Sequence, residues 1–551
     1  LPEYFEGRST QLSARRPSVF YPNPWQGGWS RFRDAVDYMI TASLGVLDIA
    51  ADLKEDWLFN VYRMGQNAIK KGEAGGPFAY VVPAEQWDDH SAREMLAMLD
   101  RGGVDIHQAT GSFTAGGKQF EAGDWVIFAG QPNRPWILTL MEPQDHPDDR
   151  LYPGGPPKPP YDLAGWTFPI QMGVEAIRVD EPFRASVEPV AEIRAAPGEV
   201  AQGAGFGYAL THRDNASFLA VNRLLKDGEK VSWAGSAFRG GGSAYEAGTI
   251  VVEGTGSRTR ARVEALAGEL GLDFTEMASR PDVPLLQLSL PRIGLYKSWQ
   301  ANMDEGWTRW ILEQWEFPVD TLHDADVRSL DLSGYDAIVL PDQDAERTLN
   351  GYAPGQMPPE YVGGMGVEGA AKLKAYVQGG GTVVALDKAS DFAIQQFGLP
   401  VRNVVAEVSE SDFFIPGSLI RLSVDVSHPL AWGMQADAAA FFVNSRAFEV
   451  VQPASSGELS AGPSPVTVVA RYGARDLLMS GWEVGGDRYL LNRPAVVSGK
   501  LGQGNVVLLG FRAQFRGQPR GTFKLLFNAL HAATLKTFPG AAVASAGGGG
   551  G

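Results

Sequence analysis

The stretch Ser333-Gly-Tyr-Asp-Ala-Ile-Val-Leu-Pro341 contains a short apolar run that predicts a buried β-strand. Comparable strand-like runs lie on both sides of it, at Ile293-Gly-Leu-Tyr296, Phe317-Pro-Val-Asp320 and Gly379-Gly-Gly-Thr-Val-Val-Ala-Leu386. Helix-forming segments at 306–316 and 369–378 separate these runs. Strands that alternate with helices are typical of a doubly wound parallel sheet.

The chain after residue 400 has a different pattern, with short strands in place of alternating strands and helices. Strand-like runs occur at Leu419-Ile-Arg-Leu-Ser-Val424, Val466-Thr-Val-Val-Ala470 and Asn505-Val-Val-Leu-Leu-Gly510. A helix at 522–535 is expected to return and cover the sheet. We therefore predict a flavodoxin-like α/β domain at 289–540 with a β-rich insertion.

A duplication precedes this domain. The stretches Phe78-Ala-Tyr-Val-Val-Pro-Ala84 and Phe113-Thr-Ala-Gly-Gly117 reappear as Phe206-Gly-Tyr-Ala-Leu-Thr-His212 and Phe238-Arg-Gly-Gly-Gly242. The first copy reads as strand, helix, strand, hairpin and strand, and its helix is expected to start at the capping box Ser91-Ala-Arg-Glu94. We predict small α/β modules at 76–150 and 201–288, and we interpret this repeat as a scaffold.

The segments that join and end these modules are rich in proline and glycine. Tyr152-Pro-Gly-Gly-Pro-Pro-Lys-Pro-Pro-Tyr161 predicts polyproline conformation, so residues 151–200 are expected to form a stiff connector. Recognition of this stretch as a proline-rich ligand is the alternative. Residues 541–551, which end in a run of glycines, are expected to be disordered or artificial.

The first 75 residues predict two amphipathic helices. Ser30 is expected to cap the first, which carries Phe32 and Leu47 on one apolar face, and the second spans about 54–71. These helices expose a wide apolar face with no sheet before them. We predict that residues 1–75 are the helical tail of a domain whose body lies elsewhere.

Bulk composition limits the classes of function. The 551 residues are too many for one core and suggest several domains, and the net charge of −16 argues against a nucleic-acid partner. The chain has no cysteine, which excludes disulfides and thiolate chemistry. It has no apolar run long enough to span a bilayer. Because it begins at Leu1 without Met, we expect a processed or partly observed product.

The histidines are the first candidates for catalysis or metal binding. None of the seven falls in a His-x-x-Glu or His-Glu-x-x-His pattern, so each is expected at the surface or in a turn, and the capping box already accounts for Glu94 near His90. These histidines are His90, His107, His146, His212, His323, His428 and His531.

Two acidic residues, Asp342 and Asp344, directly follow a predicted parallel strand, where open α/β sheets bind ligands. A bound cation or polar ligand there and a capped loop are both open, and an active hydrolase that uses either carboxylate is a third reading. The glycine-rich run Val362-Gly-Gly-Met-Gly366 lacks the Lys-Ser/Thr of a phosphate-binding loop.

Residues 292–390 resemble a class I glutamine amidotransferase-like domain, on the stretches 333–341 and 379–386. The resemblance implies a nucleophilic cysteine on a tight turn after a strand, with a His–Glu pair supplied later. This chain has no cysteine and no Gly-x-Ser-x-Gly. We therefore expect a degenerate pseudoenzyme domain.

Residues 15–180 are similar to the region that follows the catalytic domain in large secreted bacterial zinc carboxypeptidase-like proteins, relatives of carboxypeptidase A. The resemblance rests on Asn23-Pro-Trp-Gln-Gly-Gly-Trp29, Arg101-Gly-Gly-Val-Asp-Ile-His107 and Leu151-Tyr-Pro-Gly-Gly-Pro156. It implies that the zinc ligands and the general base lie upstream. Glu3 and Glu6 match no motif, so we assign no catalytic, cofactor-binding or metal-ligating residue to this chain.

These observations predict a non-catalytic C-terminal region of a secreted zinc carboxypeptidase-like protein, whose parent carries out proteolysis. Its modules would serve as a scaffold or bind a substrate or partner. The alternative is a structural or surface-assembly protein formed from the processed C-terminal product. The expected partners are the chain's own upstream peptidase domain, another protein or further copies of the chain. The expected location is secreted or periplasmic, in a bacterium.

Overall fold

The computed structural model divides the chain into two compact units, residues 1–68 and 69–551. The predicted glycine tail at 541–551, and Glu3 and Glu6, lie outside the described residues. No helix in the described part combines the length and hydropathy needed to cross a bilayer. The structure describes residues 13, 15–19, 21–201, 205–240, 243–451 and 465–535.

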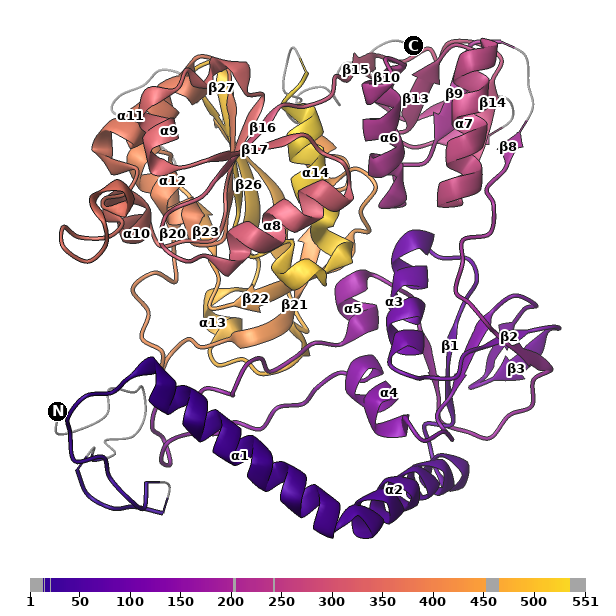
Figure 1. Ribbon diagram of the computed structural model, residues 1–551. Coiled ribbons are helices and arrows are strands. Elements are labelled where there is room, and N and C mark those ends of the chain that lie inside the picture. Colours follow the sequence, from indigo (N-terminus) through magenta and orange to yellow (C-terminus); the bar gives the residue numbers. More distant parts are fainter. Residues whose placement is uncertain are drawn as a thin grey trace. The chain divides into compact units, whose positions relative to one another are not determined.

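The first unit contains the helix α1 (Phe32–Asp52) and most of α2 (Lys54–Ala74), shown in Figure 1. The prediction that Ser30 caps α1 is wrong. The cap residue is Arg31, whose backbone N–H donates to the Asp34 carboxylate at 2.8 Å, so an acid in the first turn supplies the cap interaction. No residue of α1 is buried.

The first α/β module is a five-stranded sheet in the order β6-β1-β5-β2-β7, with a separate β3–β4 hairpin. Its helix α3 begins at Asp89, so the predicted start at Ser91 is wrong. Asp88 is the cap because its carboxylate accepts from the Ser91 backbone N–H at 3.0 Å. The elements are β1 (Ala79–Val82), α3 (Asp89–Arg101), β2 (His107–Ala109), β3 (Phe113–Ala115), β4 (Lys118–Phe120), β5 (Trp125–Phe128), α4 (Arg134–Met141), α5 (Phe168–Met172), β6 (Ile177–Val179) and β7 (Val187–Pro189).

The second module repeats this topology. Its sheet order β14-β9-β13-β10-β15 matches β6-β1-β5-β2-β7 strand for strand, with β8 added at one edge and a β11–β12 hairpin beside it. The duplication seen in the sequence is therefore a duplication of fold. The elements are β8 (Val200–Ala201), β9 (Gly207–Leu210), α6 (Ala216–Lys226), β10 (Lys230–Ala234), β11 (Phe238–Gly240), β12 (Ser243–Tyr245), β13 (Ile250–Glu253), α7 (Ser257–Leu270), β14 (Phe274–Met277) and β15 (Leu285–Gln287).

The third part is one large sheet whose first half is parallel. Strands β17, β16, β18, β19 and β27 pair in parallel, and β26, β24, β21 and β22 extend the sheet in antiparallel fashion. The parallel strands and the helices that join them are β16 (Ile293–Tyr296), α8 (Met303–Gln314), β17 (Val319–Leu322), α9 (Asp324–Ser329), β18 (Ala337–Leu340), α10 (Ala345–Asn350), α11 (Gly366–Gln378), β19 (Thr382–Leu386), α12 (Ala389–Phe397) and β27 (Gly504–Leu509).

The β-rich addition fills the interval between α12 and β27, and a last helix follows β27. The prediction of a multidomain α/β protein, with duplicated modules ahead of a parallel sheet with β-rich additions, is confirmed. The added elements are β20 (Val401–Asn403), β21 (Pro416–Val424), β22 (Asp437–Val443), β23 (Phe448–Val450), β24 (Val466–Tyr472), β25 (Leu478–Ser480), α13 (Gly486–Tyr489), β26 (Pro494–Leu501) and α14 (Phe523–Ala532).

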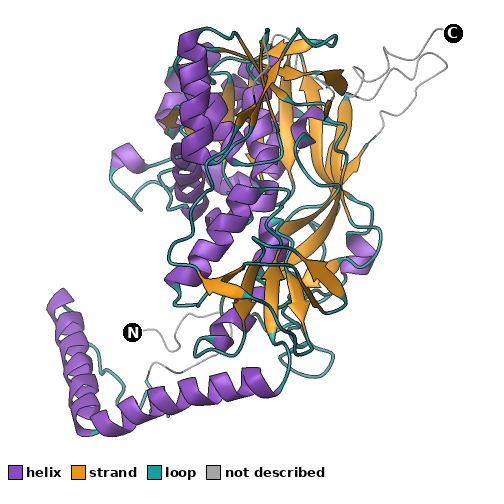
Figure 2. Ribbon diagram, turned by 90° about the vertical axis from the view of Figure 1, so that its right-hand side faces the viewer, coloured by secondary structure: helices purple, strands orange, loops and turns teal. Residues whose placement is uncertain are grey.

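Apolar side chains are buried on both faces of the large sheet, which Figure 2 shows among its helices. One face packs against α8 and α14, including Ile311 and Leu526. The other packs against α9, α11 and α12, including Leu373 and Phe392. Because both faces are covered, the parallel strands are apolar throughout, which is why they could be found in the sequence.

The two modules meet the large domain at a buried polar junction. The starts of α3 and α6 lie together, since the His90 backbone N–H donates to the Asp214 carboxylate at 3.1 Å. The ammonium of Lys524, from α14, donates to Asp88 at 3.0 Å and to the Asn215 side-chain oxygen at 2.9 Å. One lysine of the C-terminal helix therefore joins the equivalent helix starts of both copies.

Candidate functional site

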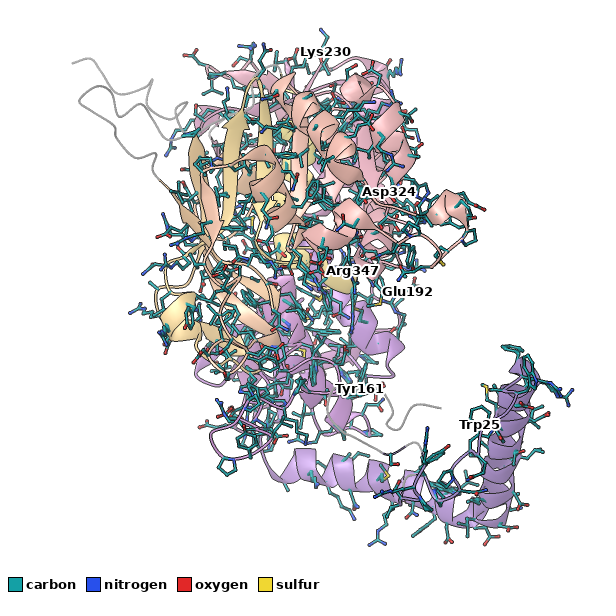
Figure 3. All side chains as sticks on the ribbon, turned by 90° about the vertical axis from the view of Figure 1, so that its left-hand side faces the viewer. Trp25, Tyr161, Glu192, Lys230, Asp324 and Arg347 are labelled. Atoms are coloured by element: carbon teal, nitrogen blue, oxygen red, sulfur yellow. The ribbon has the colours of Figure 1, made fainter. Side chains whose placement is uncertain are left out.

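Charged side chains gather at the carboxyl edge of the parallel strands, the edge at which open α/β sheets bind ligands. Asp342 follows β18, Asp387 follows β19, and Arg512 lies three residues beyond β27. Asp304, in the first turn of α8, completes the group. We call Asp304, Asp342, Asp387 and Arg512 the edge cluster. Arg347, labelled in Figure 3, lies on α10 above the same edge.

Asp387 occupies a strained turn between β19 and α12. Its φ is +48°, a left-handed conformation that costs a non-glycine residue about 1–3 kcal/mol. Its backbone is fixed at both ends, because its N–H donates to the Leu509 carbonyl at 2.8 Å and its carbonyl accepts from the Ser390 N–H at 2.9 Å. The side chain is fully buried and accepts from the Ser445 hydroxyl at 2.8 Å.

The Arg512 guanidinium lies between three carboxylates. It contacts Asp342 at 2.6 Å, Asp387 at 3.4 Å and Asp304 at 3.6 Å. Arg446 lies 4.0 Å from the Asp387 carboxylate. Because several carboxylates share few cations in a buried place, the cluster disfavours full ionisation.

Two carboxyl groups of the edge cluster have raised pKa values. Burial, together with the neighbouring Asp342 carboxylate, raises the pKa of Asp387 to about 8. The pKa of Asp304 rises to about 6, mainly because of burial and against the attraction of Arg512. Perturbed carboxyl groups at a sheet edge are typical of functional sites, although buried ion networks produce them too.

The structure places the two acids singled out in the sequence at this edge, in different roles. Asp342 is buried and belongs to the edge cluster, and it also accepts from the Lys388 backbone N–H at 3.0 Å. Asp344 stands at the start of α10, but its side chain makes no cap hydrogen bond, so the capped-loop reading does not hold for it. It contacts Lys388 at 3.4 Å and Arg347 at 3.9 Å.

Sequence reasoning missed Asp304, Asp387 and Arg512. A usable signal existed for two of them, because Asp387 directly follows the predicted strand at 379–386 and Arg512 closely follows the one at 505–510. The carboxyl-end rule, applied to every predicted strand, selects both. Asp304 carries no such signal, since it lies inside a helix start.

The prediction of surface or turn positions is wrong for His212, His428 and His531, which are buried. His212 bonds the Asn528 side-chain oxygen at 2.8 Å, and His531 bonds that of Asn222 at 2.8 Å. Burial lowers the pKa of His212 to about 4 and that of His531 to about 3, so both are neutral core residues at pH 7. Within the described ranges, no three His, Asp or Glu side chains are grouped to hold a metal ion.

Two larger cavities, of about 630 and 590 Å³, flank Trp87 near the junction of the modules and the large domain. Their central charges already have partners, since Asp88 pairs with Lys524 and the Arg213 guanidinium lies 4.1 Å over the Trp87 ring. The carboxyl edge differs because part of its buried polar surface has no partner. We therefore take the edge cluster as the candidate site.

Comparisons with known proteins give only distant likenesses. No family model matches the chain, and no curated protein matches it. Among solved structures, a cytoplasmic protein from Salmonella typhimurium is 16% identical, with a TM-score of 0.29, covering 45% of this chain and 100% of that one. A putative ThuA-like protein from Bacteroides uniformis is 12% identical, with a TM-score of 0.26, covering 47% and 94%. A putative GMP synthase protein from Thermoplasma acidophilum has the same identity and TM-score, covering 44% and 94%. Likeness at this level carries no argument about function.

Proposed function

We propose that this chain is the non-catalytic C-terminal region of a secreted or periplasmic bacterial zinc carboxypeptidase-like protein. Its modules bind a substrate or partner, and its first unit docks on the peptidase domain of the same parent. Zinc and the general base belong to that domain. The sequence resemblance over residues 15–180 supports the family, and the contacts of Asp387 and the exposed surface of α1 and α2 support the roles.

The non-catalytic role is supported by the residue on the tight turn after β19. In the amidotransferase-like family, such a turn carries the nucleophilic cysteine, whereas here it carries Asp387. That carboxylate is fully buried and faces Arg512, Arg446 and Ser445. A side chain held in this way is a structural centre of charge and has no free path to a substrate carbonyl.

The observation that carries the docking role is the apolar surface of α1 and the first part of α2. Contiguous exposed apolar surface in a folded protein marks an interaction site. Phe32 is 88% exposed and Leu44 is 60% exposed. The exposed large apolar residues are Phe32, Tyr38, Met39, Ile40, Leu44, Val46, Leu47, Ile49, Leu53, Trp57, Leu58, Phe59, Val61, Tyr62 and Met64.

Charge placed on this surface tests the docking role. We expect the double variant Leu44→Glu/Leu47→Glu to weaken binding to the separately produced peptidase domain by about 100-fold or more, because each buried leucine contributes about 1.5–3 kcal/mol. Calorimetric titration of the two proteins measures the effect. The matched control is Val367→Glu, which places the same charge on an apolar residue that is 79% exposed on α11.

Two outcomes contradict the docking role. In the first, the double variant and the control bind the peptidase domain equally well. In the second, the wild-type chain forms a dimer in sedimentation experiments and the double variant is a monomer, which would favour the alternative of a surface-assembly protein. A stable dimer of that kind would bury well over about 1,000 Å².

A further inference from the structure

A cavity of about 220 Å³ opens at the carboxyl edge of the parallel sheet. It lies between the start of α8, the loop after β18 and the side chain of Arg512. Asn302, Asp304, Gln343 and Lys388 are among its lining residues. At roughly 30 Å³ per water, the volume corresponds to about seven water molecules, so the cavity fits a small polar group.

Two buried polar atoms in this cavity have no hydrogen-bond partner. They are Oδ1 of Asp304 and Nε2 of Gln343, and each residue is only 8% exposed. The other oxygen of Asp304 faces Arg512 at 3.6 Å. An unpaired carboxylate oxygen and an unpaired amide N–H are costly in a buried place, typically about 1–3 kcal/mol each. The cavity therefore presents one acceptor and one donor that a ligand can satisfy.

The charges around the cavity favour a cation. Four buried or half-buried carboxylates share two guanidinium groups. They are Asp304, Asp342, Asp387 and Asp391, facing Arg446 and Arg512. A proton retained on Asp387 removes one negative charge and leaves one uncompensated. The oxygen without a partner belongs to Asp304, so the missing positive charge belongs beside it.

The same surroundings disfavour an anion, although the start of a helix often binds one. The Asp304 and Glu305 backbone N–H groups at the start of α8 already donate to the Asn302 side-chain oxygen, at 2.9 and 3.3 Å. At the rim, Lys388 and Arg347 are paired with Asp344. The net charge of −16 on the whole chain also attracts cations.

We propose that this cavity binds the cationic group of a basic amino acid, the ammonium of lysine or the guanidinium of arginine, carried by a peptide or by the free amino acid. The cation pairs with Asp304 Oδ1, and Gln343 Nε2 donates to a carbonyl or carboxylate oxygen of the same ligand. The inference rests on the binding role proposed above for the modules. It does not depend on the link to a peptidase, so the two proposals can fail separately.

Calorimetric titration of the full chain with four probes tests this assignment. L-lysine and L-arginine are expected to bind, whereas norleucine and citrulline, which match them in length without the charge, are expected to bind at least about tenfold more weakly. The tripeptide Gly-Lys-Gly separates the two sources, since tighter binding than free lysine identifies a peptide ligand.

Variants assign the binding to the cavity. Asp304→Asn should weaken lysine binding at least about tenfold, whereas Glu346→Gln, which removes an exposed charge nearby on α10, should leave it unchanged. Gln343→Leu provides a second variant, with an intact cation site and a lost donor, if Asp304→Asn unfolds. Equal binding of lysine and norleucine, unchanged binding in both cavity variants, or tighter binding of Ca²⁺ alone than of lysine would overturn the proposal.

Discussion

Replacing Lys524 with methionine is expected to lower the free energy of unfolding by about 3–5 kcal/mol, because it leaves a buried carboxylate without its cation. Lys524 and Asp88 are almost completely buried, and their side chains pair at 3.0 Å. Burial alone would raise the pKa of Asp88, but the Lys524 ammonium outweighs it and the pKa lies below its ordinary value. Urea unfolding followed by circular dichroism measures the change.

Two comparison variants isolate the junction. Lys226→Met removes an exposed lysine from α6 and should change stability by less than about 0.5 kcal/mol. The double variant Lys524→Met/Asp88→Asn removes both charges and should be more stable than the sum of the single changes by about 0.5–3 kcal/mol. A loss below about 1 kcal/mol for Lys524→Met would contradict the view that this lysine joins the two modules to the large domain.

Replacing Asp387 with asparagine is expected to change how stability depends on pH. The pKa of this carboxyl is about 8 in the folded chain, against an ordinary value of 3.8. Between these values the folded state holds a proton that the unfolded state has lost, so the stability of the wild type falls as pH rises. The limiting slope is about 1.4 kcal/mol per pH unit.

The asparagine variant lacks this titration. Its stability relative to the wild type should therefore increase from about pH 4 to about pH 8 and level off above that range. Unfolding in urea at four or five pH values measures the difference, and Asp344→Asn, at a half-exposed position of the same edge, is the matched control. A constant difference across the range would mean that Arg512 and Arg446 keep Asp387 ionised in the folded chain.

The fold could largely be predicted from the sequence because its signals are local. Strands such as Ala337–Leu340 are apolar throughout, since both faces of the sheet are covered. The repeated aromatic and glycine pattern identified the two modules. Helix starts were predicted less well, because Asp88 and Arg31 act as caps where serines nearby matched the expected motif.

The charged centres could not be predicted because their partners are far apart in the chain. Lys524 and Asp88 are separated by 436 residues, and the sequence pattern contains nothing that pairs them. His212 and His531 appeared to be ordinary turn and helix residues, and only tertiary packing places them in the core as neutral rings. Hydrophobic periodicity reports which face of an element is covered, whereas these polar contacts depend on how the elements meet.

The role of the first unit is the part of the account that most needs a physical test. An apolar surface on α1 and α2 and a buried Asp387 on the strained turn are both consistent with a non-catalytic region that depends on another domain. The resemblance over residues 15–180 names that domain as a zinc peptidase.

The most direct test is the intact mass and the zinc content of the natural protein, purified with an antibody raised against this chain. The account predicts a polypeptide heavier than 59.4 kDa that contains about one zinc ion and releases C-terminal residues from peptides. A natural protein of 59.4 kDa without zinc, with no peptidase encoded upstream, would contradict it.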